Sequence, residues 1–213
     1  MSDLAPASDQ VAGAPHPRET SQLFGQDRAE ATFLQAHTAG RLHHGWLLTG
    51  PRGIGKATLA WRIARFLLST PIDDGPALFA PPPAQTLDVD PEHPVARRII
   101  AGAEPGLASV TRTVNEKTGR MRDEIVVDDI RKFHRFFGLS ATDGGRRVVI
   151  VDTADDMNVS AANALLKMLE EPPARSTLLL VSHQPSRLLP TIRSRCRTLR
   201  LAPLSAAHVQ NAL

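Results

Sequence analysis

Short, continuous apolar runs alternate with longer amphipathic stretches along most of the chain. Apolar runs bounded by polar or turn-forming residues are typical of strands that are buried on both faces of a sheet. We expect five of them, at 46–49, 107–110, 148–151, 178–181 and 198–201. Because helical stretches lie between most of these runs, the pattern predicts a three-layer α/β domain with a mainly parallel five-stranded sheet.

The amphipathic stretches predict the helices of this domain. One helix is expected over 27–40, and a second follows residue 55, where apolar residues recur at i, i+4, i+7 and i+8. The clearest pattern covers 160–170, where Ser160 can serve as the N-cap and the proline pair at 172–173 ends the helix. Its apolar stripe consists of Ala162, Leu165, Leu166 and Leu169.

Two segments lack this periodicity. Residues 1–21 are rich in Ala, Pro, Ser and Asp and have too few apolar residues to order themselves, so we expect a disordered tail. Residues 70–95 are crowded with proline and aspartate, which predicts an insertion or long loop. The globular domain is expected to span 22–203.

The composition is that of a globular protein, with 42% hydrophobic and 22% charged residues, and the length suits one full domain. No run of about 18 apolar residues occurs, and the N-terminus has no basic-then-apolar signal pattern. We therefore expect a soluble, cytoplasmic protein without a membrane partner. Cys196 is the single cysteine, which excludes an internal disulfide and a Cys-pair zinc site, so neither redox nor metal chemistry is indicated.

Arginine dominates the basic residues, because only four of the 25 are lysines, while the formal net charge is +3. The planar guanidinium donates in pairs and suits phosphate recognition. A GC-rich genome would favour arginine equally, so charge alone does not establish nucleic-acid binding. A sequence-specific DNA-binding module has little support, since the chain has no helix-turn-helix or zinc-finger spacing.

The strongest motif is GPRGIGKAT at Gly50–Thr58, which matches G-x-x-x-x-G-K between a predicted strand and a predicted helix. That context distinguishes a phosphate-binding P-loop from a chance glycine-rich turn. In such a loop the backbone N–H groups around Gly50, Gly53 and Gly55, together with the helix N-terminus, cradle the phosphates of ATP or ADP. Lys56 would reach the terminal phosphates.

The residue after the P-loop lysine normally supplies a hydroxyl to magnesium, but here it is Ala57. Thr58 is a further candidate for nucleotide contact. Its position is rotated by about 100° around the helix, so its hydroxyl should not reach the same metal. The magnesium site is therefore expected to be weak or absent, and catalysis is in doubt.

The second nucleotide element is an apolar strand that ends in an acidic residue, and residues 147–152 supply it. Asp152 would hold magnesium, usually through water. The following residue is Thr153, which has no carboxylate. Asp155 and Asp156 lie beyond the strand end, and we expect them to cap or solvate the loop before the next helix.

Two further motifs lie downstream in the same register. Residues 163–173 read NALLKMLEEPP, and residues 188–196 read LLPTIRSRC. Behind a P-loop, these sequences resemble the signatures of the clamp-loader branch of the AAA+ family. The segments 24–26 (FGQ) and 43–46 (HHGW) also resemble that family, so the resemblance covers about residues 23 to 204.

The resemblance implies a role for Arg195, the arginine of the S-R-C sequence. In clamp loaders this arginine projects into the ATP site of the neighbouring subunit, where an arginine finger stabilises charge on the transferred phosphoryl group. The alternative is that Arg195 is one of several solvated arginines in this part of the chain. His183 stands at the family's sensor position near the terminal phosphate; the alternatives are a structural histidine, or Ser182 in that role.

The resemblance also indicates which kind of subunit this is. Hydrolysing AAA+ proteins carry a glutamate where this chain has Thr153, and motor subunits usually carry a four-cysteine zinc module, so a non-hydrolysing subunit without zinc is implied. Its partners would be the motor (gamma/tau) and delta subunits of the DNA polymerase III clamp loader, the sliding clamp and, through the assembly, primed DNA. The alternative is a hydrolysing gamma/tau-like motor. Residues 204–213 would begin a truncated helical lid domain.

Overall fold

The computed structural model describes residues 8–9, 13–72, 84–115, 117–138 and 145–212. Its five strands form one sheet in which all neighbours are parallel, in the order β2-β3-β4-β1-β5. They are β1 (Gly45–Thr49), β2 (Leu107–Val110), β3 (Arg147–Asp152), β4 (Ser176–Ser182) and β5 (Arg197–Arg200). The predicted five-stranded parallel sheet is confirmed, while parts of the predicted tail and of the proline-rich loop lie outside the described residues.

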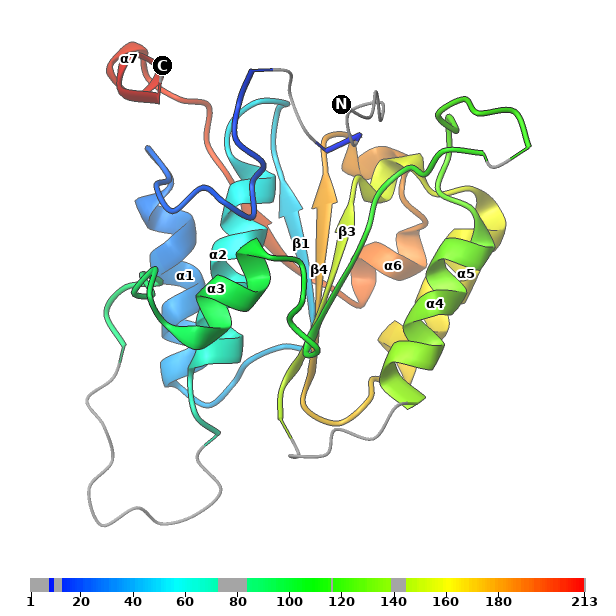
Figure 1. Ribbon diagram of the computed structural model, residues 1–213, viewed down its shortest axis with the longest axis horizontal. Helices are drawn as coiled ribbons and strands as arrows, with labels where there is room; N and C mark the ends of the chain where they lie inside the picture. The colour runs from blue at the N-terminus through cyan, green and yellow to red at the C-terminus, as the bar shows by residue number, and fades with distance from the viewer. Residues whose placement is uncertain (1–7, 10–12, 73–83, 116, 139–144, 213) are drawn as a thin grey trace.

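Helices cover both faces of the sheet (Figure 1). One layer consists of α1 (Asp27–Thr38), α2 (Lys56–Ser69) and α3 (Pro94–Ile100), and the other of α4 (Val127–Gly138), α5 (Val159–Glu170) and α6 (Pro190–Ser194). Two 3-10 turns, η1 (Ala154–Asp156) and η2 (Pro185–Arg187), follow β3 and β4, and helix α7 (Ala206–Ala212) follows β5. Within the described ranges, no helix is long and apolar enough to cross a membrane.

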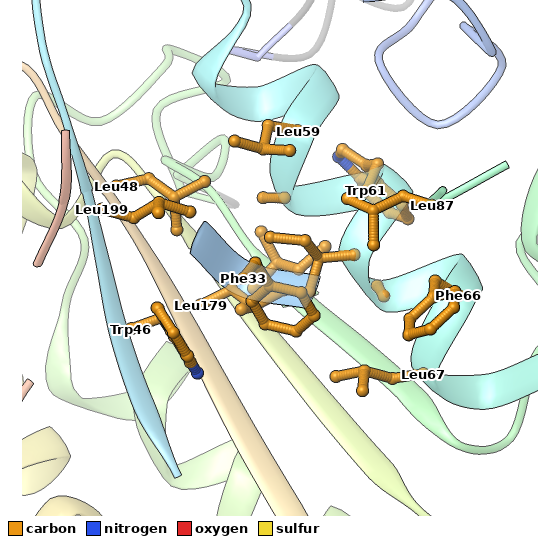
Figure 2. Packing of buried hydrophobic residues seen from close by; sticks show 14 of the residues in the cluster. Phe33, Trp46, Leu48, Leu59, Trp61, Phe66, Leu67, Leu87, Leu179 and Leu199 are labelled. Atoms are coloured by element: carbon orange, nitrogen blue, oxygen red, sulfur yellow. The ribbon is translucent and has the colours of Figure 1, made fainter. Parts of the chain in front are cut away.

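The burial of both sheet faces explains the continuous apolar runs. In β1, Trp46 and Leu48 belong to the core shared with α1 and α2, while Leu47 belongs to the core shared with α4 and α5. This alternation follows from the two-residue repeat of a strand. Figure 2 shows the first core, where Phe33 of α1 packs against Trp46 with ring centroids 5.0 Å apart.

Helix α5 begins earlier than the sequence pattern predicts. Its N-cap is Asn158 rather than Ser160, because the Asn158 side chain accepts a hydrogen bond from the Ala161 backbone N–H at 2.9 Å. Asn158 also has the extended backbone that an N-cap requires, with φ −71° and ψ 168°. Most of the predicted apolar stripe is buried as expected, but Leu166 is only half-buried.

Residues 13–21, which were expected to be disordered, pack along α2. The buried side chain of Arg65 donates a hydrogen bond to the Arg18 carbonyl at 2.7 Å, and the buried Arg62 donates to the Ser21 carbonyl. These contacts need no apolar periodicity, since the arginines of α2 bind the backbone of the segment and not its side chains. The low apolar content that predicted disorder does not reveal such hydrogen bonds.

The segment that leads into α3 is irregular, as the proline and aspartate content predicts. Residues 84–93 form no helix or strand, and the helix starts at Pro94, a residue suited to the first turn. The segment is nevertheless anchored, because Leu87 is buried and Asp88 forms an ion pair with Arg62 at 2.9 Å.

Candidate functional site

The glycine-bearing loop joins the end of β1 to the start of α2. Gly50, Gly53 and Gly55 have φ angles of 148°, 76° and 90°, in a region that residues with side chains rarely adopt. A Cβ on Gly55 would lie 2.4 Å from the Leu23 side chain, and one on Gly50 would lie 2.9 Å from the Leu201 carbonyl oxygen. The loop conformation therefore depends on glycine at these positions.

This loop presents unused backbone donors at a helix N-terminus. Among the described residues, the N–H groups of Gly53, Gly55 and Lys56 donate to no protein acceptor. A Cβ on Gly53 would meet no atom within 4 Å, so that side of the loop is open. Converging N–H groups at the positive end of a helix dipole suit a phosphate group.

The Lys56 ammonium is held by its own loop. It donates to the Gly50 carbonyl at 2.7 Å and to the Pro51 carbonyl, and the residue is only 3% exposed. Burial lowers the pKa of Lys56 to about 8, although the nearby charges of Asp152 and Asp155 oppose this shift. To reach a phosphate, Lys56 must leave these two carbonyls.

The first turn of α2 lacks a hydroxyl at the usual magnesium position. Ala57 follows Lys56 there and supplies no oxygen ligand. Thr58 is half-buried, and in the described part of the chain its hydroxyl forms no hydrogen bond. The loop therefore fits a phosphate group better than it fits a phosphate–magnesium pair.

The ends of β3 and β4 lie side by side and bring Asp152, Thr153 and His183 together. The Thr153 hydroxyl donates to an Asp152 carboxylate oxygen at 3.1 Å and lies 3.2 Å from His183 Nε2. Burial, followed by the neighbouring positive charges of Lys56 and Arg52, lowers the pKa of His183, so the ring is neutral at pH 7. Thr153 thus connects the two predicted site residues where a hydrolysing enzyme would need a carboxylate.

Burial raises the pKa of Asp152 to about 6, while the hydrogen bond from Thr153 and the charge of Lys56 oppose the shift. The folded state therefore binds more protons than the unfolded chain between about pH 4 and 6, and this group's stabilising contribution is lost as pH rises through 6. We expect Asp152→Asn to be more stable than wild type at pH 7.5, with the gap shrinking by about 2 kcal/mol at pH 4.5. Urea unfolding at both pH values measures the gap, and a gap independent of pH would contradict the assigned cause.

Asp155 has a different role from the one expected of it. One carboxylate oxygen accepts the Ser182 hydroxyl at 2.6 Å, and the other accepts the backbone N–H groups of His183 at 2.5 Å and Gln184 at 3.0 Å. Asp155 therefore fastens the turn that follows β4, not the loop before α5. Since the Ser182 hydroxyl is already engaged, Asp155 also explains why His183 is the group presented toward Thr153.

Gln26 is a structural residue of the site that sequence reasoning missed. It is buried, and its side-chain amide donates to the carbonyls of Ile54 at 3.1 Å and Ala202 at 2.9 Å, while its oxygen accepts the Ala202 N–H at 3.1 Å. One side chain thus ties the chain segment before α1 to the phosphate loop and to the exit of β5. The FGQ sequence at 24–26 was a signal that this segment matters, but it could not show which groups Gln26 bonds to.

Arg195 lies at the opposite end of the sheet. Strands β1 and β5 are parallel, the phosphate loop follows the last residue of β1, and Arg195 precedes the first residue of β5. At about 3.3 Å per residue, the length of β1 separates the two by about 15 Å or more. The Arg195 guanidinium forms an ion pair with Glu170 at 2.9 Å and donates a hydrogen bond to the Thr191 carbonyl at 3.1 Å, so the structure does not bring it together with the other predicted site residues.

An all-parallel sheet of this strand order, with a glycine loop between β1 and α2 and an acidic residue at the end of β3, defines a P-loop NTPase fold of the AAA+ type. A solved structure of a DNA polymerase III gamma subunit-related protein from Thermotoga maritima supports this fold, with a TM-score of 0.53 at 20% identity over 81% of this chain and 47% of that one. The chain belongs to the family described as "DNA polymerase III, delta subunit", whose model matches residues 25–205.

Curated relatives carry the names of different DNA polymerase III subunits. The DNA polymerase III subunit delta' of Pseudomonas aeruginosa is 42% identical over 155 residues, which cover 72% of this chain and 41% of that protein. The subunit gamma/tau of Mycobacterium bovis is 32% identical over 179 residues, which cover 84% of this chain and 28% of that protein. The chain thus spans less than half of the length of these relatives.

Proposed function

We propose that this chain is the AAA+ domain of a delta'-type clamp-loader subunit, which completes the ATP site of a neighbouring subunit with Arg195 and does not hydrolyse ATP itself. Its partners in this role are the motor (gamma/tau) and delta subunits, and the assembly loads the sliding clamp onto primed DNA. The protein acts as a component of DNA polymerase III. The observation that carries the proposal is the separation of Arg195 from the phosphate loop of its own chain.

The parallel sheet supports a role for Arg195 in another subunit. Its guanidinium cannot reach a nucleotide bound at Gly50–Lys56, because the whole length of β1 lies between them. The side chain is 37% exposed, so it remains accessible to a neighbouring subunit. A charged donor fork on the surface suits a terminal phosphate presented by another chain.

The nucleotide site supports the absence of hydrolysis. Ala57 supplies no magnesium ligand, and the Thr153 hydroxyl, already bonded to Asp152, cannot replace a carboxylate that orients the attacking water. Asp155 is the nearest further carboxylate along the chain, but both its oxygens are occupied. ATP or ADP would then bind through the backbone N–H groups and Lys56, with a weak or absent magnesium site.

The competing function is a gamma/tau-like motor that hydrolyses ATP. It is favoured by the gamma/tau relative at 32% identity and by the intact glycine geometry of the loop. The two functions differ in what the isolated chain does with ATP and magnesium.

We expect the isolated chain to release phosphate from ATP no faster than its Lys56→Ala variant, because the groups needed for hydrolysis are missing whether or not phosphate binds. Phosphate release under excess ATP and magnesium measures this. Turnover by the wild-type chain that disappears in Lys56→Ala would support the motor and overturn the proposal. If calorimetry detects nucleotide binding but no phosphate is released, the proposal stands.

A further inference from the structure

We infer that Glu170 is a positioning residue for Arg195: it holds the guanidinium in the orientation in which a neighbouring subunit receives it. This inference rests on the proposed function of Arg195. The two residues form an ion pair: Glu170 is the last residue of α5, and Arg195 caps the end of α6.

Two contacts fix the Arg195 side chain. Glu170 Oε1 forms an ion pair with Nη2 at 2.9 Å, and the Thr191 carbonyl accepts a hydrogen bond from Nη1 at 3.1 Å. Because the guanidinium is planar, contacts at two of its nitrogens fix the direction of the whole group. The hydrogen bond uses one of its five N–H donors and the ion pair engages Nη2, so further donors remain for an external acceptor.

The backbone that carries this pair is anchored to the start of β1. A Cβ on Gly45 would lie 2.8 Å from the Leu169 side chain and 3.3 Å from the Arg195 carbonyl oxygen, so the ends of α5 and α6 both close upon Gly45. His44 Nε2 lies 3.0 Å from the Leu169 carbonyl oxygen. Burial lowers the pKa of His44, which favours the neutral ring that donates to this carbonyl at pH 7.

This ion pair should contribute little to the stability of the fold. The Glu170 and Arg195 side chains are 44% and 37% exposed, and exposed ion pairs contribute little to folding. Such a pair can instead orient the side chain. An arginine that is already held in its working orientation loses less conformational entropy when a neighbouring subunit docks. The opposite role, in which Glu170 neutralises Arg195 until it is released, predicts the opposite effect of removing the carboxylate.

The test uses a clamp loader reconstituted with this protein and its motor and delta subunits. Glu170→Gln removes the charge and keeps the size, and we expect kcat for DNA-stimulated ATP hydrolysis to fall by about 10-fold while KM for ATP stays unchanged, since only orientation is lost. Glu171→Gln is the matched control: it is the adjacent, exposed glutamate, and among the described residues its side chain has no ion pair, so kcat should not change. Equal melting temperatures of the two variants show that folding is intact.

Arg195→Ala, measured in the same assembly, separates the failure of this inference from failure of the proposed function. If Arg195→Ala lowers turnover but Glu170→Gln leaves kcat unchanged, Glu170 does not position the arginine. If Glu170→Gln raises kcat, Glu170 restrains the arginine and the inference is overturned. If Arg195→Ala itself has no effect, both the proposed function and this inference are wrong.

Discussion

Under the proposed function, replacing Arg195 with alanine should lower ATP turnover at the neighbouring subunit's site by about 10³-fold, because that site loses the positive charge that stabilises its transition state. Clamp loading should fall with it. The measurement is steady-state ATP hydrolysis and clamp loading by a reconstituted assembly that contains the variant. The isolated chain should melt as the wild type does, since the guanidinium makes only exposed contacts.

Arg193→Ala is the control for this effect. Arg193 lies on α6, the short helix whose end Arg195 caps; it is exposed and forms no ion pair in the part of the chain that the structure describes. Its loss should leave turnover close to wild type. Equal losses from the two variants would mean that the positive charge of this surface, and not one positioned guanidinium, supports hydrolysis.

Asp155→Ala should cause a large loss of stability. The substitution leaves one hydroxyl and two backbone N–H groups without their acceptor at the buried end of β4. With a cost of about 1–3 kcal/mol for each buried unsatisfied group and some relief by water, we expect a loss of about 3–4 kcal/mol in the free energy of unfolding. For a chain of this size, the melting temperature should fall by about 10 °C, which thermal unfolding can measure.

Asp156→Ala provides the comparison, because it removes a carboxylate one residue away. Asp156 forms a partly exposed ion pair with Arg112 at 3.2 Å, so its loss should cost under about 1 kcal/mol. Asp155→Asn keeps one acceptor oxygen and should fall between the two. If Asp155→Ala and Asp156→Ala unfold at the same temperature, the three hydrogen bonds do not anchor the turn after β4.

The fold could be predicted well because its strands are buried on both faces. The run at 107–110 coincides with β2, and each of the other four differs from its strand by one or two residues at one or both ends. Continuous apolar sequence is enough to recognise such strands. The glycine loop was also predictable, since positive φ angles at Gly50, Gly53 and Gly55 restrict those positions almost to glycine.

The parts that could not be predicted depend on partners far away in the sequence. Gln26 bonds to Ala202 across 176 positions, and Asp155 bonds to a turn 27 to 29 positions further on. A polar residue shows in a sequence only that it must find a partner once buried, and not which partner it finds. For the same reason, the binding of residues 13–21 by the arginines of α2 left no recognisable pattern.

The phosphate loop and Arg195 lie at opposite ends of one parallel sheet, so the domain has a head, at the phosphate loop, and a tail, at Arg195. Domains that meet head to tail form heterologous contacts, and these build an arc or a ring instead of a twofold-symmetric pair. Under the proposed function, the tail of this chain completes a neighbour's site while its own head lacks the groups for hydrolysis, which places the chain at one end of a row of hydrolysing sites. Because the five parallel strands separate Arg195 from the phosphate loop, their direction would determine which position this chain occupies in such an assembly.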